Sequence, residues 1–172
     1  KTPNVIIPER KAAIATPKDS AQIAPDGAQG IKFMLKDLRF TGQTVLSEAE
    51  LKSAYAGMIG TTISLDKAWV IAAQVTDKYR TEGYFLSRAY VPAQTIDDGI
   101  LTIAVVEGFI EDVRVTSEQG GSRSQLLEKW IREIKSRKPL KTEDLESALL
   151  ELNAAGGINY RAVLLPPKKT SG

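Results

Sequence analysis

The most regular pattern of apolar and polar positions lies between residues 83 and 108, and it predicts a β-hairpin. Leu101, Ile103 and Val105 alternate with polar or small residues across positions 100–106, as in a half-buried strand. A shorter strand is expected over residues 85–91. The segment 92–98, which begins with a proline, is expected to turn the chain between the two strands.

Apolar residues spaced three and four apart predict helices before this hairpin. Ser47 and Glu50 form a capping box, which is expected to open a short helix that runs to about residue 56. Ser64 is expected to cap a longer helix that ends at Gly83. Further upstream, residues 31–40 alternate as a strand but change parity at Lys36–Asp37, which predicts a β-bulge there.

Two landmarks of this unit recur about 75 residues later, which indicates an internal repeat. Residues 35–40 share their pattern with residues 110–115, and GYFLSRAYVP (83–92) shares its pattern with GINYRAVLLP (157–166). Between the later landmarks, one helix is expected on Leu127, Trp130, Ile131 and Ile134, and another is expected to begin at Thr142. The counterpart of strand 100–106 would fall beyond residue 172, so the chain is expected to be a fragment of a longer protein.

The sequence therefore predicts an α+β fold of two tandem β-α-α-β-β units. Each unit is expected to be a small mixed sheet covered by two helices, and the second unit is expected to lack its last strand. Residues 1–30, which contain four prolines and no lasting period, are expected to be a linker or arm. The first unit is expected to span residues 31–107 and the second residues 108–172, with little freedom at the short link around residue 108.

Composition narrows the possible chemistry. The 23 basic and 21 acidic residues give a net charge of +2, which is too balanced to indicate a nucleic-acid partner. The sequence has no Cys and no His, which excludes thiol nucleophiles, imidazole bases and Cys/His zinc sites. Asp97 and Asp98 precede a glycine and are interpreted as turn formers. The sequence predicts no cofactor, no metal, no nucleotide site and no enzymatic activity.

Basic residues gather in the second unit, with Glu128, Glu133 and Glu143 among them. We interpret this cluster as a solvated helix face, with contact to an acidic partner or to lipid headgroups as the alternative. Its members are Arg123, Lys129, Arg132, Lys135, Arg137, Lys138 and Lys141.

The tandem units, together with the runs GYFLSRAYVP and DGILTIAVVEG, resemble the polypeptide-transport-associated (POTRA) domains of two-partner secretion transporters. Those transporters export haemolysin-like and filamentous-haemagglutinin-like proteins. The resemblance is strong over residues 31–115 and looser as far as Pro166. It implies a location at the periplasmic face of the outer membrane of a Gram-negative bacterium. It also implies a C-terminal β-barrel pore that would follow these units in the whole protein.

The resemblance further implies that the units bind an unfolded exoprotein or adhesin through its N-terminal secretion domain and deliver it to the barrel. We expect binding by β-strand addition to the first strand of each hairpin, which the resemblance implies is a sheet edge. The side-chain parity of these strands stays open. The candidate partner-binding residues are Phe85, Leu86, Ser87, Arg88, Ala89, Tyr90 and Val91, and Tyr160, Arg161, Ala162, Val163, Leu164 and Leu165.

Two other hypotheses remain. The units could be structural spacers or barrel-assembly modules that do not bind the client directly. They could also be the accessory region of a secreted hydrolase, which the tandem arrangement disfavours.

Overall fold

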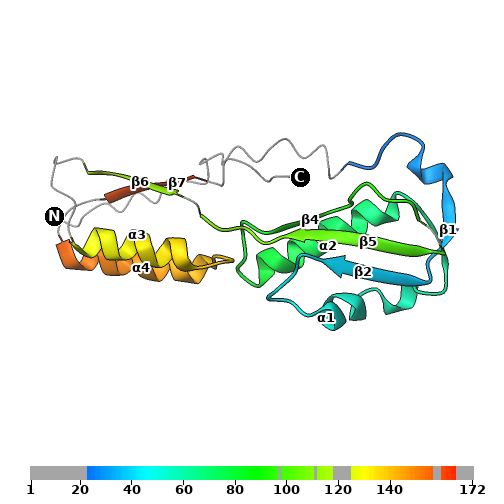
Figure 1. The fold of residues 1–172 in the computed structure, drawn as a ribbon, viewed down its shortest axis with the longest axis horizontal. Coiled ribbons are helices and arrows are strands. Elements are labelled where there is room, and N and C mark those ends of the chain that lie inside the picture. The colour runs from blue at the N-terminus through cyan, green and yellow to red at the C-terminus, as the bar shows by residue number, and fades with distance from the viewer. Residues whose placement is uncertain (1–22, 97, 111, 118–124, 157–159, 166–172) are drawn as a thin grey trace, which may run out of the picture.

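The computed structural model describes residues 23–96, 98–110, 112–117, 125–156 and 160–165. Its elements lie in two groups arranged end to end along the long axis of the molecule (Figure 1). The first group contains every described element up to the strand that ends at Val106, and the second contains those that follow.

A three-stranded sheet of mixed direction supports the first group. Its central strand is β5 (Ile100–Val106), which pairs in parallel with β2 (Asp37–Thr41) and antiparallel with β4 (Arg88–Tyr90). The predicted strand over residues 100–106 is confirmed. Its residues are alternately buried and half-buried, and the buried set is Leu101, Ile103 and Val105.

Two helices, α1 (Glu48–Ser53) and α2 (Lys67–Thr81), complete this core. The capping box at Ser47 is confirmed, because its hydroxyl accepts from the Glu50 N–H and the Glu50 carboxylate accepts from the Ser47 N–H. The α2 stripe is buried at Ala68, Ile71, Ala72, Val75 and Tyr79.

Both helices are shorter than the periodicity predicts. α1 ends at Ser53, and the chain continues into a separate 3-10 turn, η3 (Ala56–Met58). Ser64 does not cap α2, because it belongs to strand β3 (Thr62–Ser64) and the helix begins three residues later. Gly83 does follow the end of α2 with a φ of 89°, a left-handed conformation that glycine adopts at low cost.

The bulge expected at Lys36–Asp37 is wrong. Strand β1 (Lys32–Met34) pairs with β3 in a separate two-stranded sheet, whereas β2 pairs with β5. Leu35 is fully buried between them, and the Lys36 N–H donates to Gly99 O at 2.8 Å. The change of parity therefore marks the point at which the chain leaves one sheet and joins another.

Part of the segment expected to be a linker has regular structure. The 3-10 helix η2 (Ala28–Gly30) lies directly before β1, and Ala28 is buried. Positions 1–22 of that predicted linker lie outside the described residues.

The second group runs β6 (Asp112–Ser117), α3 (Gln125–Ser136), α4 (Thr142–Gly156) and β7 (Tyr160–Leu165). The predicted helices over this region are confirmed, and Leu127, Trp130 and Ile134 are buried on α3. β6 and β7 pair antiparallel over their whole length, with the two helices along one side (Figure 1). In the described part of the chain this sheet has two strands, so no strand separates β6 from β7 as β5 separates β2 from β4.

The two groups meet at a compact junction. Phe85 and Leu86 from the first group pack against the second core, which contains Ile110, Leu127, Trp130, Ile134 and Leu140. The Thr142 N–H and hydroxyl both donate to Gly83 O, at 2.9 and 3.1 Å. The N–H of Leu140 donates to Gly108 O at 3.1 Å.

Candidate functional site

The predicted partner-binding segment over residues 85–91 is divided between three environments. Only Arg88–Tyr90 form strand β4. Phe85 and Leu86, expected in the strand, pack instead against the core of the second group. Ser87 is 2% exposed, and Val91 lies beyond the strand against the first core.

The strand begins late because residues 84–87 form a turn into the junction. The Ser87 N–H donates to Tyr84 O at 3.0 Å, so it is not available to a strand partner. The Ser87 hydroxyl accepts from the Gly108 N–H at 3.1 Å. A Cβ on Gly108 would lie 2.3 Å from Leu86 O, so the two backbone segments approach as closely as glycine allows.

The strand ends early because, beyond its last residue, a side chain rather than the strand backbone bonds to β5. Pro92 has no N–H to donate to β5. The Gln94 amide takes over this role, since it accepts from the Thr102 N–H at 2.8 Å and donates to Thr102 O at 2.7 Å. β4 is therefore an edge strand of three residues. The turn before it and the Gln94 amide after it prevent the strand from extending further along β5.

The structure resolves the side-chain parity of this strand. Ala89 is fully buried against α2, whereas Arg88 and Tyr90 are half-buried on the opposite face of the sheet. Because neighbouring residues turn their backbone groups to opposite sides, the N–H of Ala89 points away from β5. That N–H donates to the buried hydroxyl of Thr76 at 2.8 Å.

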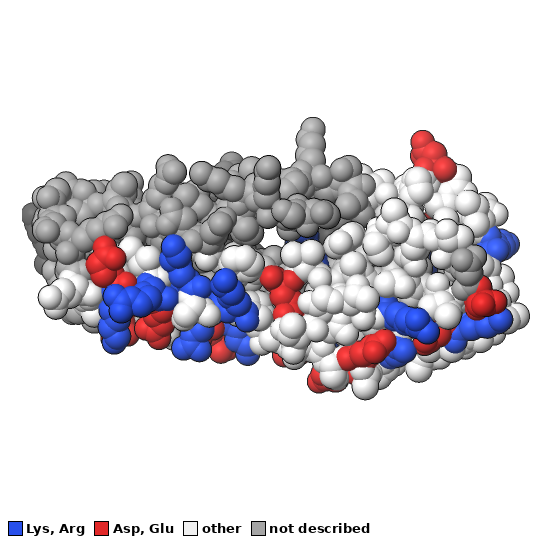
Figure 2. Space-filling model, viewed as in Figure 1, with Lys and Arg blue, Asp and Glu red and all other residues white. Residues whose placement is uncertain are grey.

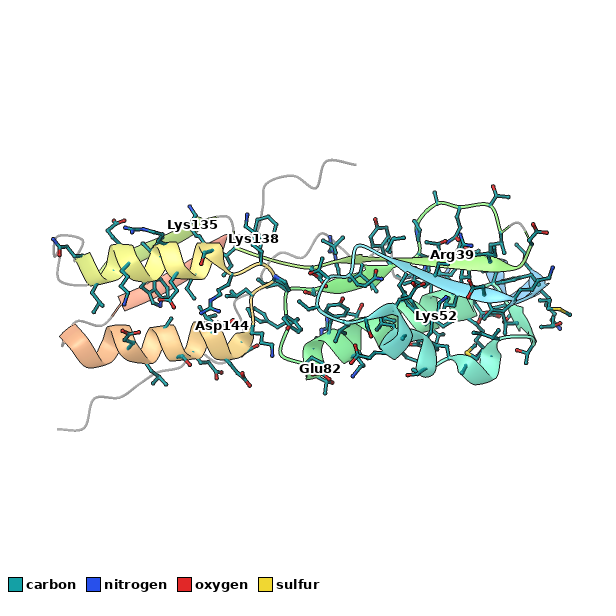
Figure 3. All side chains as sticks on the ribbon, turned by 60° about the horizontal axis from the view of Figure 1, so that its bottom comes forward. Arg39, Lys52, Glu82, Lys135, Lys138 and Asp144 are labelled. Carbon is teal, nitrogen blue, oxygen red and sulfur yellow. The ribbon has the colours of Figure 1, made fainter. Side chains whose placement is uncertain are left out.

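The other outer strand, β2, shows a related arrangement. The Leu38 N–H donates to Asp37 Oδ1 at 2.9 Å and so does not take part in the ladder with β5. Asp37 lies 3.0 Å from Lys52 Nζ on α1 and 3.7 Å from Arg39 Nε. Figure 3 labels these two basic residues. The hydrogen bond from Lys52, with help from Leu38 and Arg39, lowers the pKa of the Asp37 carboxyl despite its partial desolvation.

In the second group, β7 covers the predicted residues Tyr160–Leu165. Its inner side pairs with β6 from Tyr160 opposite Ser117 to Leu165 opposite Asp112. In the described part of the chain no strand pairs with its outer side. β7 is thus a six-residue edge, longer than β4.

A carboxylate at the end of β5 ties three segments of the first group together. Glu107 accepts from the N–H and hydroxyl of Thr44, from the Val45 N–H at 3.0 Å and from the Tyr79 hydroxyl at 2.9 Å. Desolvation would raise the pKa of Glu107, but these hydrogen bonds outweigh it and lower that pKa. Burial and the bond to Glu107 strongly raise the pKa of Tyr79.

The described members of the basic cluster lie on α3 (Lys129, Arg132 and Lys135) and in the connection from α3 to α4 (Arg137, Lys138 and Lys141). Acidic side chains lie among the basic ones on this face (Figure 2). Arg137 lies 3.7 Å from Glu133 and 3.9 Å from Asp144. Lys138, which follows α3 near the junction (Figure 3), stacks over Phe109 at 4.5 Å from the ring centre. Several of these cations therefore have partners within the protein.

A shallow groove separates α3 from α4. It is lined by Leu126, Trp130 and Ala148 on its apolar side and by Lys129, Glu133 and Glu151 on its polar side. Among the described residues, no group of three or more acidic, His or Cys side chains could hold a metal ion. Within the same residues, no helix has the length and apolar character needed to cross a membrane.

Comparison with known proteins identifies the fold. Residues 33–108 match the family model of the POTRA domain, ShlB-type. The outer membrane transporter CdiB of Dickeya dadantii is 22% identical over 143 residues, covering 83% of this chain and 25% of the relative. The heme/hemopexin transporter protein HuxB of Haemophilus influenzae is 24% identical over 144 residues, covering 82% and 25%.

The fold is also similar to that of a solved transporter. CdiB from Escherichia coli matches with a TM-score of 0.64 and 21% identity, over 85% of this chain and 29% of that one. The family model and the solved structure thus agree that residues 33–108 are similar to a POTRA domain of the ShlB type. The predicted resemblance to two-partner secretion transporters is confirmed, and these relatives are transporters rather than enzymes. The chain spans about a quarter of the length of the curated relatives that it matches.

The roles of four residues at β4, at the end of β5 and at the junction do not follow from the sequence pattern. Thr76 is a polar residue on an otherwise apolar helix face, and this is the one feature of the sequence that points to a role for it. Hydrogen bonds to backbone groups of other segments give Gln94, Glu107 and Thr142 their roles. Periodicity does not reveal such bonds.

Proposed function

We propose that this chain is the periplasmic region of an outer-membrane transporter of two-partner secretion. In this proposal it binds an unfolded exoprotein or adhesin through an N-terminal secretion domain. It then delivers that client to a C-terminal β-barrel of the same protein. The ShlB-type POTRA domain and the similarity to the transporters CdiB and HuxB support this assignment.

The pair of edge strands is the observation that supports this mode of binding. β4 and β7 each end their sheet, and no described strand covers their outer sides. An extended client can add a strand at such an edge through main-chain hydrogen bonds, which depend little on client sequence. This tolerance suits a long unfolded substrate, and the bonds require no nucleotide.

The structure narrows the residues proposed for this contact. Phe85, Leu86 and Ser87 are engaged in the junction, so a client of the first unit is left with residues 88–91. β7 offers the longer edge, and every second residue of Tyr160–Leu165 turns its N–H and C=O away from β6. We therefore propose β7 as the main strand-addition site.

Proline variants of β7 test this mode in the chain itself. Ala162→Pro and Val163→Pro each remove one N–H, and these two N–H groups point to opposite sides of the strand. One variant removes an outward donor, and its neighbour removes a donor to β6. We expect the outward variant to lose binding of the partner's N-terminal secretion domain in a titration.

Circular dichroism and amide exchange on β6 check that the outward variant keeps its sheet. Wild-type affinity in both variants would contradict strand addition at β7. Loss of binding only in the variant that also unfolds the sheet would count against it as well.

The junction favours a second candidate, a spacer that sets the orientation of neighbouring parts of a transporter. Phe85 and Leu86 are packed into the second core, and Thr142 and Leu140 bond across the boundary. Export by the intact transporter separates the two candidates. A spacer predicts that export survives the β7 variants and fails when Gly108→Ala disturbs the junction, whereas client binding predicts failure with the outward β7 variant.

A further inference from the structure

The outer edge of β4 is occupied by a side chain of α2. The N–H of Ala89 donates to Thr76 Oγ1 at 2.8 Å, and the C=O of Ala89 lies 3.4 Å from the same hydroxyl. Thr76 also donates to Ala72 O at 3.0 Å, within its own helix. The hydroxyl therefore accepts from the outward N–H of Ala89, and its one hydrogen is shared between Ala72 O and the more distant Ala89 O.

Ala89 is the residue of β4 at which strand addition would occur. In an antiparallel ladder, Arg88 and Tyr90 turn their N–H and C=O groups toward Val106 and Ala104, whereas Ala89 turns its groups outward. Ala89 is fully buried and Thr76 is 3% exposed, so neither water nor another chain reaches this position in the closed molecule.

We infer that Thr76 closes the β4 edge against strand addition. An incoming strand pairs with β4 only by replacing the Thr76 hydroxyl as the partner of Ala89, which requires α2 to withdraw locally. The inference rests on the proposed function, because it concerns how a client gains access to one of the two proposed edges.

This arrangement has a physical rationale. An uncovered edge strand pairs readily with unrelated chains, so proteins cover or shorten such edges. Here the strand is cut to three residues, and its one outward N–H is bonded to a side chain rather than to another strand. A hydroxyl is a replaceable partner, because the backbone of an added strand supplies the same donor and acceptor.

Two substitutions distinguish the effect of the Thr76 hydroxyl from the effect of side-chain packing. Thr76→Val keeps the shape of the side chain and removes the hydroxyl, while Thr76→Ser keeps the hydroxyl and serves as the matched control. The first measurement is amide hydrogen exchange at Ala89 in the chain without ligand. The hydrogen bond lowers the equilibrium constant for local opening by about fivefold. Exchange in Thr76→Val is therefore expected to be about fivefold faster than in wild type.

The second measurement is binding of a synthetic peptide of alternating threonine and valine with a lysine at each end. Strand addition at β4 is expected to be about fivefold tighter in Thr76→Val, because the competing bond to Ala89 is gone. Thr76→Ser is expected to bind as wild type does. A purely structural Thr76 predicts instead that Thr76→Val binds no more tightly than wild type.

The outcomes separate this inference from the proposed function. Unchanged exchange at Ala89 in Thr76→Val overturns the inference, and so does faster exchange without tighter binding at β4. If the peptide binds β7 while Thr76→Val has no effect, the inference fails and the proposed function stands. If the peptide binds neither edge in any variant, strand addition fails and the inference fails with it.

Discussion

Glu107→Gln is expected to destabilise the first group, because the Glu107 carboxylate bonds to two separate segments and ties both to the end of β5. Its partners are Thr44 and Val45 in the loop before α1 and Tyr79 on α2, while Glu107 itself follows β5. Glutamine keeps the shape, loses the charge and leaves only one oxygen to accept. A hydrogen bond to a charged group is worth about 1 kcal/mol more than a neutral one.

Four such bonds set an upper limit of about 4 kcal/mol on the loss of unfolding free energy. The carboxylate is only partly buried, so solvent screening reduces the expected loss to about 1–2 kcal/mol at pH 7. Urea denaturation of the two proteins measures this difference directly.

The pH dependence gives this prediction a sharper test. The folded-state pKa of Glu107 is lowered below its ordinary value of 4.5, so its stabilisation is complete above the unfolded pKa. That stabilisation is lost as the pH falls through the folded pKa, and wild type and Glu107→Gln should then converge. Glu82→Gln is the control, because Glu82 forms only an exposed pair with Lys78 at 3.0 Å.

The control is expected to change the free energy of unfolding by less than about 0.5 kcal/mol. Equal stability of wild type and Glu107→Gln at pH 7 would refute the argument. A difference that persists unchanged at acid pH would refute it too, because the charge would then not be its cause.

Two further substitutions test the closed ends of β4. Gly108→Ala should cost about 1–3 kcal/mol of unfolding free energy, because its Cβ would lie 2.3 Å from Leu86 O. Gly57→Ala, whose Cβ meets no atom within 4 Å, should change little, and similar losses in both would contradict the junction argument. Gln94→Ala should lower the free energy of unfolding by about 1–2 kcal/mol. It should also speed amide exchange at Thr102, because Thr102 loses both of its hydrogen bonds to the Gln94 amide. Unchanged exchange there would show that the side chain does not continue the ladder.

Features set by neighbouring residues could be predicted from the sequence. The alternation over residues 100–106 predicts β5, and the Ser47–Glu50 capping box predicts the start of α1. The apolar stripes of α3 and α4 likewise follow from spacing within each helix. These signals are local, so they are present before any tertiary contact is known.

Features set by distant partners could not be predicted. Phe85 and Leu86 alternate as a strand would, but their contacts are with a core assembled more than 20 residues later in the chain. The parity change at Lys36 has the same pattern as a bulge, and only the pairing of β1 with β3 distinguishes the two structures. Thr76 acts on a backbone group of β4, which no periodicity reveals.

Amide hydrogen exchange along β7 tests the central claim most directly. It should be measured in the presence and absence of the N-terminal secretion domain of the exported partner. Strand addition predicts that every second amide of Tyr160–Leu165 gains protection, namely those that do not donate to β6. No gain in protection on β7, with protection appearing instead along the groove between α3 and α4, would contradict it.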